Sequence, residues 1–304
     1  MNSKHFFSLV LFFVISLDSF AQSNLLNAKS PDEIGKKTQA QLLSDNDKPL
    51  EYGFVDDRDV LMSKMVWETI DLNERINFPL YFPIDTANIG SDRRSLFHTL
   101  YEGVKKGQVG KIYQDSYFNI PRNVRDVEKA LTSRDTTGPG SDEYNNYLDD
   151  YRSGKKVLED QYIDIKTSGS SFVTEYRIKG LWYFDKRQGE LKYRLIAICP
   201  MIIQAADTRK DDPVAAELFW IYYPAARDVL NKAYAFNDKN SSMPISFDRL
   251  LNSRRFNSVI TKSENVYGDR EIDKYLQDNS QLQLLEAERL KNVIRDFEQD
   301  MWNY

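Results

Sequence analysis

The 304-residue chain has one cysteine, Cys199, and two histidines, of which only His98 lies beyond the first 21 residues. A single cysteine excludes a disulfide framework within the chain, so the hydrophobic core must hold the fold. Hydrolytic triads and zinc sites normally use histidine. Cys199 stands in an apolar stretch and is expected to be a small core residue. His98 is expected to occupy an ordinary half-buried position of a helix. Together they argue against a Cys/His nucleophilic pair.

An excess of positive charge is also missing. The formal net charge of −5 and the isoelectric point near 5.3 exclude a typical nucleic-acid-binding protein. Three adjacent acid pairs, Asp56-Asp57, Asp149-Asp150 and Asp211-Asp212, could offer the two carboxylates of a glycosidase. With 46 acidic residues, however, such pairs arise by chance.

The acid pairs do not follow the alternating pattern of an EF-hand, and a glycine-rich phosphate-binding loop is absent from the sequence. The sequence therefore predicts no catalytic residue, no cofactor and no metal. A periplasmic or secreted glycan-acting enzyme and a small-ligand-binding protein remain the alternatives.

Long apolar runs are absent after the first residues of the chain. Phe6 to Leu17 is almost continuously apolar, follows Lys4 and His5, and ends at Ser19-Phe20-Ala21. This pattern predicts a cleaved signal peptide over residues 1–21, with Gln22 as the new N-terminus. A buried N-terminal helix is the alternative, and the run is too short to span a bilayer, which needs about 20 residues. Because no cysteine follows Ala21 directly, we expect an exported protein that contacts membranes only through partners.

Residues 22–56 read as an extended N-terminal arm, because their apolar residues do not recur at helical spacing. Pro31, Gly35 and Pro49 interrupt any long element. Fully extended, the 35 residues would reach on the order of 110 Å at about 3.3 Å per residue. The arm is expected either to order against a neighbouring subunit or a lipoprotein, or to be a disordered leader.

The remaining chain predicts an α+β fold with an antiparallel central sheet, flanking helices and a long C-terminal helix. Residues 57–134 are expected to be rich in helix, and the Gly-Pro-Gly stretch within Asp135–Tyr144 marks a boundary to an α+β part over 145–304. The two parts are also compatible with one continuous domain. The expected helices are Asp59–Asn73 (capped by Asp57), Asp92–Lys106, Pro121–Ser133, Pro224–Lys232, one capped by Ser246, and one from Ser280. The expected strands are Gln161–Lys166, Phe172–Phe184, Leu191–Ile203 and Glu217–Tyr222.

The helix from Ser280 carries the most detailed pattern. Ser280 and Gln283 form a capping box. Its apolar stripe is expected to be Leu290, Val293, Phe297 and Met301. Glu286/Arg289 and Glu288/Lys291 are spaced as ion pairs on the exposed faces.

Aromatic residues make up 13% of the chain and gather in clusters. Asn77 to Pro83 contains two prolines, which favour an extended path and oppose pairing as a central strand. Aromatic side chains that miss the core are the usual anchors of interfaces. We therefore expect a partner surface formed by five apolar residues: Trp67, Phe78, Leu80, Tyr81 and Phe82. The alternative is that they cover one end of the protein's own core.

Several segments, in this order, resemble the GldN family (PorN in some species), a gliding-motility and type IX secretion component of Bacteroidetes. The similarity covers roughly Asp56 to Arg270. The first two matching stretches are Asp59-Val60-Leu61 to Tyr81 and Gly180-Leu181-Trp182-Tyr183-Phe184-Asp185. The later ones are Phe219-Trp220-Ile221-Tyr222-Tyr223-Pro224 with Ala226-Arg227, Phe247-Asp248-Arg249-Leu250-Leu251 with Arg254-Arg255-Phe256, and Glu264-Asn265-Val266-Tyr267.

The resemblance implies a non-enzymatic periplasmic subunit, peripherally associated with the inner face of the outer membrane. Family members assemble with copies of themselves and with the outer-membrane lipoprotein GldK into a ring, which meets the periplasmic part of GldM. The family provides no catalytic residues to transfer to this chain.

Overall fold

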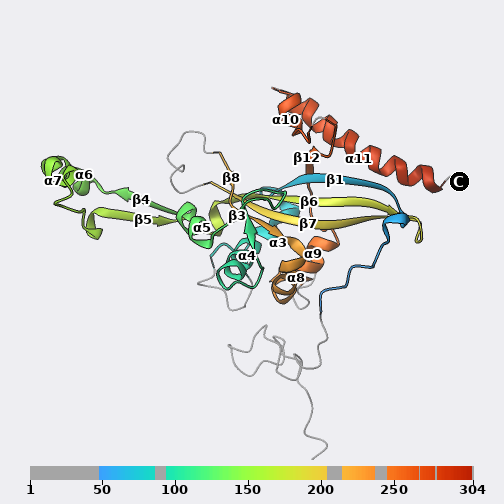
Figure 1. The fold of residues 1–304 in the computed structure, drawn as a ribbon, viewed down its shortest axis with the longest axis horizontal. Helices are drawn as coiled ribbons and strands as arrows, with labels where there is room; N and C mark the ends of the chain where they lie inside the picture. The colour runs from blue at the N-terminus through green and yellow to red at the C-terminus, as the bar shows by residue number, and fades with distance from the viewer. Residues whose placement is uncertain are drawn as a thin grey trace, which may run out of the picture.

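A central antiparallel sheet organises the fold in the computed structural model (Figure 1). The structure describes residues 48–85, 94–203, 214–236 and 245–302, except 267 and 278. Within these residues, eight strands form the main sheet in the order β12-β1-β6-β7-β9-β2-β3, with β8 also paired to β7. They are β1 Val60–Asp71, β2 Ile112–Tyr113, β3 Pro121–Arg122, β6 Val173–Asp185, β7 Glu190–Ile202, β8 Ala216–Glu217, β9 Trp220–Tyr222 and β12 Val259–Ser263.

Helices flank the sheet, and the predicted α+β class is confirmed. The helices are α3 Phe78–Tyr81, α4 Leu96–Lys105, α5 Val124–Leu131, α6 Gly138–Asn146, α7 Leu148–Arg152, α8 Tyr223–Lys232, α9 Phe247–Asn252, α10 Ile272–Tyr275 and the long α11 Ser280–Trp302. Single turns of 3-10 helix are η2 Asp57–Asp59, η3 Arg75–Asn77, η4 Asp160–Tyr162 and η5 Ser170–Phe172. Two short pairs of strands lie outside the main sheet, β10 Tyr234–Ala235 with β11 Ile245–Ser246, and β4 Thr132–Thr136 with β5 Ile163–Thr167.

The largest buried cluster lies between the sheet and helices α4, α8 and α9. Ile178 and Ile198 of the sheet join Leu100 of α4, Leu230 of α8 and Phe247 of α9 there, and all five side chains are inaccessible to solvent. A second cluster fixes α11, because Leu290 and Ile294 pack near Val66 of β1 and Ile260 of β12. Burial of such aliphatic side chains is the main favourable term in folding.

The hairpin of β6 and β7 is the longest pairing, and its turn follows from local chemistry. The Asp185 carboxylate accepts N–H bonds from Arg187 and Gln188, and Gly189 takes a positive φ of 65°. Glycine adopts that conformation without steric cost. The predicted strands Phe172–Phe184 and Leu191–Ile203 are confirmed within one residue at each end.

The predicted helix Asp59–Asn73 is wrong, because Val60–Asp71 is the strand β1, which lies between β12 and β6 in the sheet. It pairs with β6 over its whole length and with β12 over four residues. Asp56, not Asp57, provides the cap, by accepting the N–H of Arg58 at 3.2 Å, and it starts only the 3-10 turn η2. The main sheet thus joins a strand from residues 57–134 with strands from residues 145–304.

Four other local predictions need correction. Asn77–Pro83 is not extended, since Pro79 stands in the first turn of α3, where a missing N–H costs nothing. Pro121 belongs to β3, and α5 begins at Val124. The Gly-Pro-Gly stretch starts α6, whose cap is Thr137. The predicted strand Glu217–Tyr222 is interrupted, because it divides into β8 and β9.

The other helices agree with prediction more closely. Ser246 caps α9 by accepting the N–H of Arg249, as predicted. On α11 the ion pair of Glu286 and Arg289 is present at 2.6 Å. Lys291, however, donates to the carbonyl of Ser258. Val293 is half exposed, and Ala287 and Ile294 are buried with Leu290 instead.

The start of α11 also differs from prediction. The side chain of Asn279 accepts the N–H of Leu282. The Gln283 side chain donates to the carbonyl of Leu276. Asn279 therefore occupies the capping position that was expected for Ser280.

Candidate functional site

Helix α3 presents a cluster of three aromatic side chains, Phe78, Tyr81 and Phe82, called here the α3 aromatic cluster. The ring centroids of Phe78 and Phe82 lie 5.4 Å apart, and those of Tyr81 and Phe82 lie 4.9 Å apart. Positions i, i+3 and i+4 share one side of a helical turn, so the short helix gathers these rings. Phe78 is 38% exposed and Phe82 is 43% exposed, which leaves part of each ring open to solvent.

The neighbouring Leu80 points the other way and is completely buried in the main core. The Tyr81 hydroxyl donates to the carbonyl of Ser171, which fixes the cluster against the start of β6. Of the five residues predicted as a partner surface, the structure thus brings Phe78, Tyr81 and Phe82 together. Leu80 anchors these three residues to the main core and is not itself available to a partner.

Trp67 does not join this cluster. It lies in β1 and is 5% exposed. The ammonium groups of Lys179 and Lys262 stand 4.9 Å and 4.5 Å from its ring, and Tyr117 packs beside it. Burial, followed by the nearby charge of Lys262, lowers the pKa of Lys179. Trp67 is therefore covered by side chains of its own chain.

Two buried ionic networks were not predicted from the sequence. In the first, Arg227 of α8 binds Asp248 of α9 through both carboxylate oxygens, at 2.9 Å and 3.0 Å. The Tyr223 hydroxyl donates to the same carboxylate at 2.8 Å, and Asn252 donates to it at 2.9 Å. These bonds satisfy groups that would otherwise be costly to bury. The network fastens α9 to α8.

In the second network, Arg254 forms a two-bond pair with Glu68 of β1, at 3.1 Å and 2.6 Å. Arg254 has a positive φ of 50° and follows α9 in the position that usually holds glycine. Its guanidinium also stacks 4.1 Å from the centroid of the Tyr193 ring. A residue in this strained conformation persists because the surrounding contacts fix it.

The end of the N-terminal arm is ordered on the body of the protein. Tyr52 lies between two guanidinium groups, 4.8 Å from Arg194 and 4.3 Å from Arg227. Its hydroxyl donates to Asn252 at 2.9 Å, and Arg194 donates to the carbonyl of Gly53 at 2.9 Å. Residues 48–56 thus contact their own chain, whereas the rest of the predicted arm, residues 22–47, lies outside the described residues.

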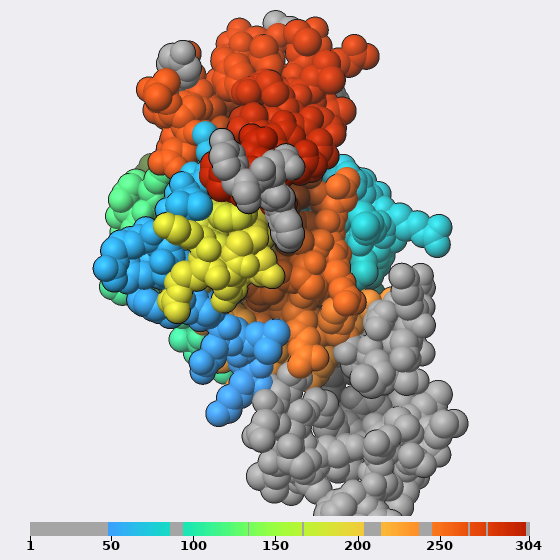
Figure 2. Space-filling view, turned by 90° about the vertical axis from the view of Figure 1, so that its right-hand side faces the viewer, coloured from blue at the N-terminus to red at the C-terminus, as the bar shows by residue number. Residues whose placement is uncertain are grey.

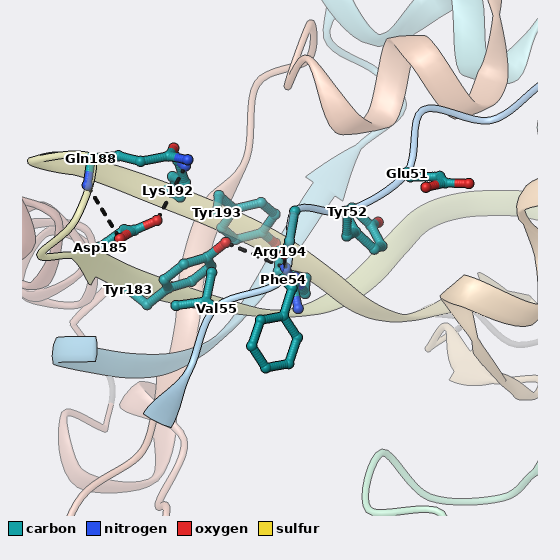
Figure 3. Close-up of a pocket in the computed structure, with 11 residues that line it drawn as sticks. Glu51, Tyr52, Phe54, Val55, Tyr183, Asp185, Gln188, Lys192, Tyr193 and Arg194 are labelled. Atoms are coloured by element: carbon teal, nitrogen blue, oxygen red, sulfur yellow. Dashed lines mark hydrogen bonds and ion pairs between the residues drawn. The ribbon is translucent and has the colours of Figure 1, made fainter. Parts of the chain in front are cut away.

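A cleft of about 310 Å³ separates this segment from the β6–β7 hairpin (Figure 3). Its walls carry Tyr183, Lys192 and Arg194 from the hairpin and Phe54 from the arm. Lys192 pairs with Asp185 at 3.4 Å, and Arg194 contacts the Tyr183 hydroxyl at 3.5 Å. Figure 2 shows the same end of the molecule, where the hairpin lies beside β1. Lys192 and Arg194 are thus each bound to a group of their own chain.

The described residues considered for catalysis lie on separate elements of the fold. Cys199 is completely buried, and burial raises the pKa of its thiol well above the usual value, which disfavours the nucleophilic thiolate. His98 lies on α4, and partial burial lowers its pKa. Asp56 is bound to Arg58, and Asp149-Asp150 lie in α7. Among the described residues, no group of three or more His, Cys, Asp or Glu side chains is placed to hold a metal ion.

Other predicted features lie outside the described residues: the signal peptide with its cleavage site at Ala21 and Gln22, and the pair Asp211-Asp212. Across the part of the chain that the structure describes, none of the helices has both the length and the apolar character needed to cross a membrane.

A comparison with protein-family models gives one match over most of the chain. The family described as "Gliding motility associated protein GldN" matches residues 55–303. This range contains β1, the α3 aromatic cluster, both ionic networks and α11. A search of curated proteins finds no significant match.

Proposed function

The chain belongs to the GldN family of gliding-motility associated proteins, and we propose that it is a non-enzymatic structural subunit of the periplasmic ring of the type IX secretion and gliding machinery. In this proposal it assembles with copies of itself and with an outer-membrane lipoprotein of the GldK type. The ring meets the periplasmic part of a GldM-type protein. The protein reaches the outer membrane only through these partners.

The observation that carries the proposal is the family match over residues 55–303. The α3 aromatic cluster supports it, because Phe78 and Phe82 remain open to solvent on a rigid helical turn held by Leu80. Exposed aromatic side chains on a fixed scaffold are typical anchors of protein interfaces. The described ionic residues support a structural role, since Glu68, Arg227, Asp248 and Arg254 are used to lock elements together.

The test is a clean deletion of the gene in its native host. We expect export of type IX cargo and gliding to stop, and a plasmid copy of the gene to restore both. Normal export in the deletion strain would refute the proposal.

A second measurement separates this function from the alternatives. A ring subunit purified from the native envelope should copurify with a lipoprotein in a particle of high mass. A small-ligand-binding protein should instead remain monomeric and show a ligand-dependent increase of its melting temperature. A glycan-acting enzyme should release sugars from envelope glycans.

A further inference from the structure

Residues 132–167, called here the ribbon, extend away from the body of the molecule (Figure 1). The ribbon consists of strands β4 and β5 with α6, α7 and η4 at its tip. Among its described side chains, none belongs to the buried hydrophobic core, which passes from Leu131 directly to Val173. An isolated two-stranded ribbon is marginally stable at best in water. The ribbon therefore needs a surface to lie against.

The two faces of the ribbon differ in chemistry. Thr136 is paired with Ile163 and Arg134 with Ile165, so these four residues lie on one face of the strands. The opposite face carries Asp135 and Asp164. Ile165 is 52% exposed. The first face thus carries two isoleucines among β-branched threonines, and its one charged residue is a cation.

Helix α11 presents a second unpartnered apolar surface. Ala287, Leu290 and Ile294 face the body and are buried, whereas Leu282, Leu285 and Val293 are 46%, 64% and 50% exposed. At 3.6 residues per turn, Leu285 lies on the side of α11 opposite the buried residues, and Leu282 and Val293 lie about 60–80° around the helix from it, on one flank of the buried residues. This arc of the helix is called here the outward side.

The same outward side of α11 ends in negative charge. Arg289 lies within this stripe, but its charge is paired with Glu286 at 2.6 Å. Asp296 and Asp300 follow on this side toward the C-terminal end of the helix. The outward side is therefore apolar at its start and acidic at its end.

We propose that the ribbon of one copy lies along the outward side of α11 of the next copy. Ile163 and Ile165 would cover Leu285 and Val293, and Arg134 would face Asp296 and Asp300. The occupant is a second copy, because one chain carries both complementary surfaces: a face with two isoleucines and a cation, and a side of α11 with apolar residues and anions.

The position of the two surfaces supports a ring. In Figure 1 the ribbon leaves one end of the molecule, and α11 lies over the other half, so the two surfaces are separate parts of one chain. A contact between two different surfaces repeats from copy to copy and closes into a ring when the rotation allows it. This inference rests on the proposed ring function and assigns its subunit contact.

The test uses the double variant Ile165→Cys with Leu285→Cys, expressed in the native host and treated in the envelope with a short bismaleimide crosslinker. The native Cys199 is completely buried and does not compete for the reagent. We expect a ladder of dimers, trimers and larger products. Each single variant should remain monomeric, and the matched pair Asp164→Cys with Leu285→Cys, from the other face of the ribbon, should give little product.

Three outcomes would overturn the inference: no product larger than a dimer from the double variant, dimers from Ile165→Cys alone, or dimers from Leu285→Cys alone. The last two would indicate two-fold contacts between ribbons or between helices. The high-mass particle is measured in the same samples. If the particle and cargo export are intact without a ladder, the contact is wrong and the ring function stands. If wild-type cells contain no such particle, the proposed function itself fails.

A deletion variant gives an independent check. Residues 133–166 are replaced by Asn-Gly, which can join Thr132 to Thr167 because these residues face each other across the two strands. The bond between the Ser168 N–H and the Leu131 carbonyl, 2.7 Å, closes the base of the ribbon and is retained. We expect an unchanged melting temperature and loss of the high-mass particle. A normal particle would refute the contact.

Discussion

At the scale of single residues, substitutions in and beside the α3 aromatic cluster test partner binding and folding stability separately. Phe78 and Phe82 are partly exposed, whereas Leu80 between them is completely buried. Replacement of both phenylalanines by alanine should lower the free energy of unfolding by about 1 kcal/mol or less. The same variant should fail to form the high-mass particle. Thermal melting of the purified chain and the yield of particle from the envelope measure the two effects.

Leu80→Ala is the matched control, because it changes the same helix from its buried side. It should cost about 2–5 kcal/mol of stability through the cavity that it leaves. If the phenylalanine variant destabilises the chain as much as Leu80→Ala does, or assembles normally, the cluster is not a partner surface.

The Glu68–Arg254 pair makes a prediction about stability. Glu68 is 1% exposed, so Glu68→Ala leaves the guanidinium of Arg254 without its partner inside the protein. Loss of one member of a buried pair typically costs about 3–5 kcal/mol. The double variant Glu68→Met with Arg254→Met should lose less, because it removes the uncompensated charge. Urea unfolding of the variants measures the difference, and equal losses would contradict this assignment.

Tyr52 predicts a change of stability at alkaline pH. Burial raises the pKa of its phenol from 10 to about 12, although the charge of Arg227 opposes this shift. Above pH 10 the unfolded chain releases this proton while the folded chain retains it, which favours unfolding. The contribution of Tyr52 to stability is therefore complete below pH 10 and is lost between about pH 10 and 12. Tyr52→Phe should therefore lose less stability than wild type over this interval. Identical pH profiles of the two proteins would be evidence against the buried position of Tyr52.

At the scale of elements, the N-terminal segment 48–56 is held by few contacts, and Arg194 provides two of them. A hydrogen bond from a charged group and a cation–π contact are together worth about 1–3 kcal/mol. Arg194→Ala should thus make cleavage after the exposed Glu51 by a glutamate-specific protease about tenfold faster. Lys186→Ala, an exposed change on the same hairpin, is the control. Equal cleavage of both variants would show that Arg194 does not hold the segment.

Sequence patterns predicted those elements whose contacts are local. The β6–β7 hairpin has a turn stabilised by Asp185 and Gly189, and α9 has its cap at Ser246, so both could be located without knowledge of the fold. Strand β1 could not. It is paired on both edges, to β6 and β12, and side chains of both its faces are buried, so its apolar residues do not alternate. Leu61 and Met65 are four residues apart, a spacing that also fits one face of a helix.

The candidate site was predicted only in part, because only some of its contacts are between residues close in the sequence. The α3 aromatic cluster is a continuous stretch, and the grouping of Phe78, Tyr81 and Phe82 agrees with their placement. Whether they bind a partner remains a prediction. Trp67 was assigned to the same surface because it was placed on a helix. The partners of Glu68 and Arg227 are not visible in the sequence, since Arg254 follows Glu68 by 186 residues.

At the scale of the whole molecule, stability is distributed unevenly. The strands β6 and β7 each span 13 residues and carry the core. The ribbon strands β4 and β5 each span five residues, and none of their described side chains is buried over the hydrogen bonds. Regions with few buried apolar contacts open at low free-energy cost and exchange their amide hydrogens quickly. The isolated chain should therefore behave as a stable body with a labile ribbon.

Hydrogen exchange followed by mass spectrometry tests this difference. In the isolated chain, amides of Thr132–Thr136 and Ile163–Thr167 should exchange at least about a hundredfold faster than those of β6 and β7, because local opening there costs little compared with global unfolding. In the assembled particle the same amides should become protected, since a partner surface then covers Ile163 and Ile165. The β6–β7 amides, already protected, are the internal control. Ribbon amides that are equally slow in the isolated chain would mean that the ribbon is stable alone, and that its apolar face needs no partner.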